Sequence, residues 1–69
     1  MKNCILITSA RTGKESIMNN CDTLEDSISI IKNKTFKNNP IWEGVDINFT
    51  ATTEFNSYRI IEGNHKNII

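Results

Sequence analysis

Gly13 and Lys14 follow an apolar run near the N-terminus, as they would in a strand that leads into a phosphate-binding loop. Such a loop wraps phosphate with a glycine-rich backbone and carries a magnesium-binding hydroxyl directly after its lysine. In this chain Thr8 stands where the first glycine belongs, and Glu15 stands where the hydroxyl belongs. The segment therefore predicts an ordinary turn between two strands rather than a nucleotide site.

Asp22, Glu25 and Asp26 form an acidic group that could hold a metal ion or act as a general base. All three lie at the start of a predicted helix, where the helix dipole favours negative charge. The only histidine, His65, stands far along the chain in a predicted solvated tail. We expect these carboxylates to stabilise the helix, and we predict no catalytic residues, no metal site and no cofactor.

Cys4 and Cys21 are too few for a zinc site, and no base that would activate a thiol stands near either of them in the sequence. If the first two predicted strands form a hairpin, a pairing of Ile5 with Asn20 also places the two cysteines opposite each other. We expect buried thiols, with a cross-strand disulfide as the alternative. The chain is accordingly predicted not to be an enzyme.

A basic run at Lys32, Lys34 and Lys37 lies close in sequence to Phe36 and Trp42. Lysines beside aromatic rings could bind nucleic acid, but eight basic residues balance eight acidic ones, so no overall field attracts phosphate. Recognition of a protein is therefore favoured, and nucleic-acid binding through residues 32–37 is the alternative. The candidate binding residues are Phe36, Lys37, Ile41, Trp42 and Arg59.

The element that must position this run is a helix over Thr23 to Lys34. Thr23 can cap the first turn, and Leu24, Ile28 and Ile31 recur at helical spacing on one stripe. A stripe of this kind has to pack on another layer, and the rest of the chain is rich in strand and loop residues. We therefore predict a helix that lies on a sheet.

Residues 3–9 and 15–20 are predicted to form a hairpin about a turn at Thr12 and Gly13. A rival interpretation is one long helix over residues 14–33, because apolar residues at helical spacing run through that range. Asn19 and Asn20 are poor helix formers and argue against it. The residues at helical spacing are Ile17, Cys21, Leu24, Ile28 and Ile31.

The C-terminal half is predicted to contain a loop, Thr35 to Gly44, and then a second hairpin formed by Val45 to Thr52 and Tyr58 to Glu62. The loop is long for a helix-to-strand connection and carries bulky apolar side chains. We expect Ile41 to be buried and Trp42 to be partly exposed beside Lys37. Asn64 to Asn67 is predicted to be a mobile tail, and the sequence leaves open whether Ile68 and Ile69 dock.

The sequence thus predicts a single α+β domain over residues 1–69, of ββαββ order, with one helix on one face of a four-stranded antiparallel sheet. The alternative is βαββ with one long helix over 14–33. Cys4 to Ile7 is apolar on both faces, and one helix covers only one of them, so we expect a second copy of the chain to cover the other. A homodimer is the predicted state.

Residues 21–33, CDTLEDSISIIKN, resemble a helix start found in HicB-type antitoxins and in many small α/β proteins, over about a fifth of the chain. The three-stranded run before the helix in that family has no counterpart in the first 20 residues. We expect a small binding or inhibitory module that acts on a protein or sequesters a small ligand. Its concrete form would be a phage or mobile-element inhibitor of a host defence or antitoxin-like protein.

The apolar run at the N-terminus is too short for a signal peptide or a membrane span, so a cytoplasmic location without a membrane partner is expected.

Overall fold

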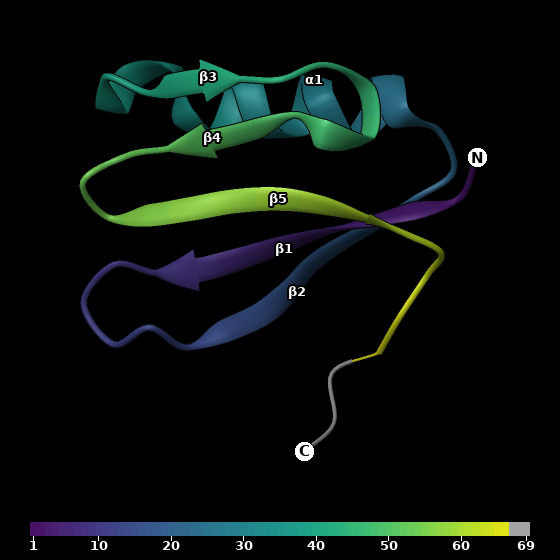
Figure 1. The fold of residues 1–69 in the computed structure, drawn as a ribbon, viewed down its shortest axis with the longest axis horizontal. Helices are drawn as coiled ribbons and strands as arrows, with labels where there is room; N and C mark the ends of the chain where they lie inside the picture. Colours follow the sequence, from purple (N-terminus) through teal and green to yellow (C-terminus); the bar gives the residue numbers. More distant parts are fainter. Residues whose placement is uncertain (67–69) are drawn as a thin grey trace.

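One helix packs on a five-stranded antiparallel sheet in the computed structural model, which describes residues 1–66 (Figure 1). The order along the chain is ββαβββ, and the order across the sheet is β2-β1-β5-β4-β3. The elements are β1 (Asn3–Ser9), β2 (Glu15–Cys21), α1 (Leu24–Thr35), β3 (Ile41–Glu43), β4 (Thr50–Thr52) and β5 (Asn56–Glu62). The predicted α+β class is confirmed, but the predicted number of four strands is wrong.

The β1–β2 hairpin is confirmed, and the rival helix over residues 14–33 is wrong. Its turn closes through two backbone bonds, in which Ser9 N–H donates to Lys14 O at 2.9 Å and Gly13 N–H donates to Ser9 O at 2.8 Å. The predicted register is wrong: Ile7 lies opposite Ser16 rather than Met18, and a β-bulge between Ile5 and Leu6 changes the offset by one residue towards the cysteines. Cys21 lies opposite Asn3, and Cys4 lies opposite Asn20.

Helix α1 begins where the sequence predicts. Thr23 is the N-cap, and its hydroxyl accepts a hydrogen bond from Asp26 N–H at 3.1 Å. The buried face of the helix consists of Ser27, Ile31 and Thr35, whereas the predicted stripe residues Leu24 and Ile28 are only partly buried. Small side chains at two of the three buried positions let the helix lie close to the sheet.

One hydrophobic core lies between α1 and the sheet. Ile5 and Ile60 stand opposite each other on β1 and β5, and fully buried Ile31 packs into the same cluster. At one end of the core, buried Ser27 donates a hydrogen bond to the amide oxygen of buried Asn3, so this polar pair is satisfied inside the fold. The remaining members of the buried cluster are Cys21, Phe49, Ala51 and Tyr58.

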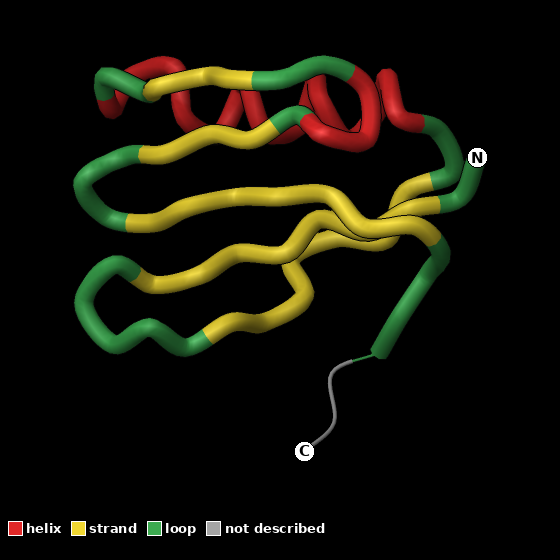
Figure 2. The backbone as a smooth tube through the Cα atoms, viewed as in Figure 1, coloured by secondary structure: helices red, strands yellow, loops and turns green. Residues whose placement is uncertain are grey.

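The segment predicted as a loop, Thr35 to Gly44, contains a 3-10 turn, Phe36–Asn38, and the edge strand β3. The strand predicted over Val45 to Thr52 is wrong in its first half, where a second 3-10 turn, Asp46–Asn48, replaces it (Figure 2). The backbone reverses here, because Gly44 (φ 77°) and Asp46 (φ 52°) both adopt left-handed conformations.

The sheet face opposite α1 is covered by the chain itself. Cys4 is 0% exposed and Leu6 is 6% exposed, although no helix lies over them. At one end of this face, Asn64 Nδ2 donates to the carbonyls of Asn3 and Cys21 at 3.0 and 3.2 Å and ties the last described residues to the sheet. These burials remove the argument that Cys4 to Ile7 requires a second copy of the chain as cover.

The predicted mobile tail is wrong at Asn64 and His65, which are hydrogen-bonded to the sheet. Asn20 exchanges two hydrogen bonds with the backbone of His65, at 2.8 and 2.9 Å, so this residue is held against the end of β2. The described residues do not include Asn67, the end of the predicted tail. They also do not include Ile68 and Ile69, for which the sequence left open whether they dock.

Among residues 1–66, no helix has the length and apolar content needed to cross a membrane.

Candidate binding surface

Large apolar side chains that the core does not use gather in the ten residues between α1 and the second 3-10 turn. We call Phe36, Ile41, Trp42 and Val45 the β3 surface; their exposed fractions are 57%, 60%, 41% and 72%. Ile41 and Trp42 lie on β3, with Phe36 before them and Val45 after them in the chain; β3 pairs only with β4 among the described residues and forms one edge of the sheet (Figure 1). Because side chains alternate along a strand, Ile41 and Trp42 point to opposite sides of this edge, with Trp42 on the side of α1. This is the densest group of exposed bulky side chains along the described chain.

The indole of Trp42 is hydrogen-bonded to the C-terminal end of α1. The indole Nε1 donates to Thr35 Oγ1 at 3.0 Å, and that hydroxyl donates to the carbonyl of Ile31 at 2.8 Å. Thr35 is fully buried at the end of α1, so the hydrogen-bonded chain links the indole to the core. The ring is thus fixed in orientation while about two fifths of the residue's surface stays open to a partner.

Lys32 lies over two aromatic rings. Its ammonium is 5.3 Å from the centre of the Trp42 ring and 5.7 Å from that of Phe49, a distance at which a cation is attracted to the ring faces. The ion pair found among residues 1–66 joins Arg59 and Glu15, so no described carboxylate neutralises Lys32. A positive charge therefore sits beside the exposed indole and is available to an acidic group.

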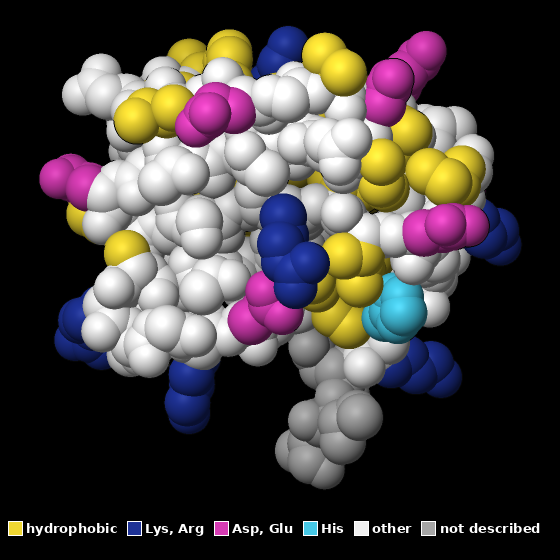
Figure 3. All heavy atoms as spheres, in the orientation of Figure 1, with side chains coloured by type: hydrophobic (Ala, Val, Ile, Leu, Met, Phe, Trp, Pro, Cys, Tyr) yellow, Lys and Arg dark blue, Asp and Glu magenta, His cyan; other side chains and the backbone are white. Residues whose placement is uncertain are grey.

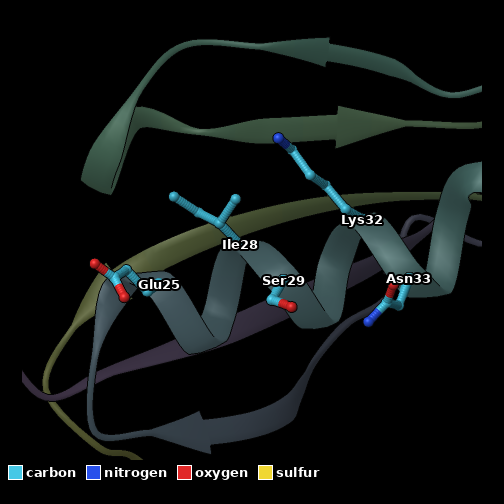
Figure 4. A pocket seen from close by; sticks show the side chains of 5 residues that line it. All are labelled: Glu25, Ile28, Ser29, Lys32 and Asn33. Atoms are coloured by element: carbon cyan, nitrogen blue, oxygen red, sulfur yellow. The ribbon is translucent and has the colours of Figure 1, made fainter.

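A shallow hollow of about 380 Å³ runs along the exposed side of α1. Figure 4 shows that Ile28 and Lys32 point from the helix in the direction of β3 and β4, whereas Ser29 and Asn33 lie on the adjacent flank of the helix. Ile28 gives the hollow an apolar lining one helical turn before the ammonium of Lys32. The residues that line this α1 hollow are Glu25, Ile28, Ser29, Lys32 and Asn33.

Four of the five sequence-predicted binding residues lie at this end of the molecule. Phe36 lies under the ammonium of Lys37, at 5.6 Å, and Ile41 and Trp42 lie on β3. The prediction that Ile41 is buried is wrong, since it is 60% exposed, whereas partial exposure of Trp42 is confirmed. The cation over the indole is Lys32 rather than Lys37.

Arg59 does not belong to this group. It lies on the sheet face opposite α1, where its guanidinium contacts both carboxylate oxygens of Glu15 at 3.0–3.1 Å. Figure 3 shows a basic and an acidic side chain in contact near the centre of this face, beside a group of hydrophobic side chains. The pair is about half exposed and covers Leu6, its neighbour on β1, so its evident role is structural.

The two thiols are separated by the sheet. Cys21 shares the helix-facing side with its partner Asn3 and joins the core, whereas Cys4, one residue later, points to the opposite side. The alternative of a cross-strand disulfide is therefore wrong, and the expectation of buried thiols is confirmed, since both cysteines are free and buried. Burial raises the pKa of the Cys4 thiol, which keeps it neutral and weakly nucleophilic near neutral pH.

Sequence reasoning missed Lys32 as the partner of Trp42 and Val45 as an exposed residue. A common environment for Lys32 and Thr35 could have been predicted, because residues three apart lie on neighbouring positions of one helix face. Nothing in the sequence indicates, however, that β3 folds back along this face. Within residues 1–66, no group of three or more His, Cys, Asp and Glu is arranged to hold a metal ion.

No family model, curated protein or solved structure matches this chain. A functional conclusion must therefore come from the β3 surface itself.

Proposed function

We propose that this protein is a non-enzymatic binding module that engages a partner protein through the β3 surface. The observation that carries the proposal is the exposure of four bulky apolar side chains within one ten-residue segment. Exposed apolar residues scattered singly are normal, but a group of them at one edge is typical of interaction sites. An inhibitor would use such a surface to cover the working face of its partner.

The fixed indole strengthens the proposal. Tryptophan is enriched among residues that dominate binding energy, and ordering a side chain on binding has an entropic cost. Trp42 is already held by Thr35 before any partner arrives, so that cost is reduced. A second copy of this chain is one protein that the surface could accept, and the predicted homodimer remains a proposal on this basis.

The test is affinity capture from a host lysate with three immobilised forms of the protein: the wild type, Ile41→Asp and Ser16→Asp. Ser16 is an exposed residue on β2, the opposite edge strand, so its variant adds the same charge away from the β3 surface. We expect the wild type and Ser16→Asp to retain the same protein and Ile41→Asp to lose it. All three should melt within a few degrees of one another.

Light scattering on the same samples shows whether the partner is a second copy. Equal capture by all three forms would show that recognition does not use the β3 surface, and the proposal would then be wrong. The same conclusion follows if wild-type protein retains nothing above bare resin.

A further inference from the structure

The charges around the β3 surface are unequal. Lys32 and Lys34 lie in the last turn of α1, and neither has a described carboxylate partner. Lys37 shares a second hollow, of about 300 Å³, with Glu54, so its charge is partly offset. On the α1 hollow the one acidic residue is Glu25, at the end farthest from the indole. Glu43 follows Trp42 on β3 and, because side chains alternate along a strand, points to the other side, so the charge next to the indole on the side of α1 is that of Lys32.

The α1 hollow adds a second element to the same region. Ile28 is half-buried and provides an apolar floor, and Lys32 stands one helical turn further on. One turn of α-helix advances ~6 Å along its axis over four residues. In an extended chain, two residues whose side chains share a face are separated by ~6.6 Å. The spacing of Ile28 and Lys32 along the helix therefore matches the spacing of alternate residues in an extended segment.

We propose that the partner presents an extended acidic segment to this surface, with an apolar side chain over Ile28 and a carboxylate two residues away at the ammonium of Lys32. This inference rests on the proposed function and specifies the chemistry of the partner. The carboxylate forms a charge-assisted hydrogen bond with Lys32, and the exposed part of Trp42 packs beside it. Charge complementarity then selects acidic segments over basic ones.

An acidic peptide fits this surface better than nucleic acid does. A phosphate backbone needs a row of cations, whereas Glu25 lies at one end of the hollow and Glu54 lies beside Lys37. One side of the Trp42 ring also carries the Lys32 ammonium, which restricts stacking of a base. Nucleic-acid binding is therefore kept as an outcome of the test.

The probe is a six-residue peptide, blocked at both ends, with leucine at its second position, glutamate at its fourth and serine elsewhere. One control peptide replaces the glutamate with lysine. A second control moves the glutamate to the third position, so that it points to the other face of an extended chain. A ten-residue oligothymidylate serves as the nucleic-acid probe.

Two readouts locate binding on the full-length protein. Trp42 is the only tryptophan, so its fluorescence reports directly on this surface. Backbone amide shifts of residues 25–33 in nitrogen-15 NMR spectra report on the α1 hollow. We expect the probe to bind with a dissociation constant on the order of 1 mM, as befits a contact of this size, and to weaken as salt is raised.

The decisive variant is Lys32→Gln, which removes the charge and keeps most of the stem. We expect Lys32→Gln to raise the dissociation constant of the probe about fivefold. Lys14→Gln, in the β1–β2 turn, should leave that constant unchanged. Both control peptides should bind at least about threefold more weakly than the probe. Melting curves of both variants show that the fold is intact.

Equal binding of the glutamate and lysine peptides would overturn the inference, as would an unchanged affinity in Lys32→Gln or no response to the probe at several millimolar. If lysate capture still depends on Ile41 in that case, the proposed function stands and only the acidic chemistry is wrong. Tighter binding of oligothymidylate than of the peptide, lost in Lys32→Gln, would also overturn it and favour the nucleic-acid alternative.

Discussion

The β1–β2–β5 part of the sheet and the β3–β4 part use their apolar side chains in opposite ways. The first is built from strands of seven residues and the second from strands of three. In β1, Cys4, Ile5 and Leu6 are at most 6% exposed, whereas Ile41 and Val45 at the other end are 60% and 72% exposed. The short-strand region therefore has more bulky apolar side chains than the core buries.

This contrast separates stability from recognition. Substitutions in the long-strand region and the helix that covers it should lower the free energy of unfolding. Substitutions of Ile41 and Val45, the mainly exposed residues of the β3 surface, should lower partner binding and leave the fold almost unchanged, whereas Trp42 contributes to both through its bond to Thr35. The predictions below test that division, and each can show it to be too simple.

The largest effect is expected for Ile31→Ala. Ile31 is fully buried in the core cluster, so its truncation removes apolar contact and leaves a cavity that costs roughly 2–5 kcal/mol. Urea unfolding followed by circular dichroism measures the loss. A loss below about 1 kcal/mol would mean that the helix relaxes into the space and that the core is less firmly packed than the burial indicates.

Gly44→Ala should destabilise the turn that ends β3. A Cβ at this position would lie 2.2 Å from the carbonyl oxygen of Asn48, and the residue has a φ of 77°. Strain of this kind costs roughly 1–3 kcal/mol. Gly13→Ala is the matched control, because Gly13 has a φ of 72° and open space around its Cβ position.

Equal losses in the two glycine variants would show that backbone strain alone, rather than the clash with Asn48, sets the cost. The difference between their unfolding free energies therefore measures how tightly the short-strand region is closed.

Trp42→Phe removes the donor to Thr35 and keeps an aromatic ring. We expect a loss of roughly 0.5–1.5 kcal/mol, the usual range for one hydrogen bond. Thr35→Val removes the acceptor, and the double variant should cost less than the sum of the two single variants, because both break the same bond. Strict additivity would show that the bond does not couple the indole to α1.

The smallest effect on stability is expected for Ile41→Thr and Val45→Thr. Both side chains are mainly exposed, so each change should alter the free energy of unfolding by less than about 0.5 kcal/mol. The same variants should weaken capture of the partner. A marked loss of stability at either position would mean that the β3 surface contributes to the fold, and the division between the two regions would fail.

The elements that sequence reasoning predicted correctly have strong local determinants. Thr23 caps α1 as expected, and the apolar run in β1 with Gly13 in its turn is enough to specify a hairpin. The predicted register is two residues off at Ile7 and one residue off at Cys4, on either side of a bulge between Ile5 and Leu6 that no local pattern reveals. One shifted residue was sufficient to move Cys4 and Cys21 to opposite faces.

The short-strand region was mispredicted for a different reason. Alternation over Val45 to Thr52 is typical of a strand, but left-handed conformations at Gly44 and Asp46 bend its first half away. The alternating apolar residues of this half contribute to core packing instead of strand pairing, because Phe49 reaches the core from the end of a 3-10 turn. Trp42 could be identified as a candidate from its type, but its support by Thr35 and Lys32 depends on tertiary structure.

The position of β5 has a consequence for the order of folding during synthesis. β5 is the last strand along residues 1–66, yet it lies between β1 and β4 and joins the two parts of the sheet. Until residues 56–62 have been made, the β1–β2 hairpin and the β3–β4 hairpin share no strand pairing, and β1 presents an open edge that other chains could join. A nascent chain halted before Asn56 is therefore the form of this protein most exposed to aggregation.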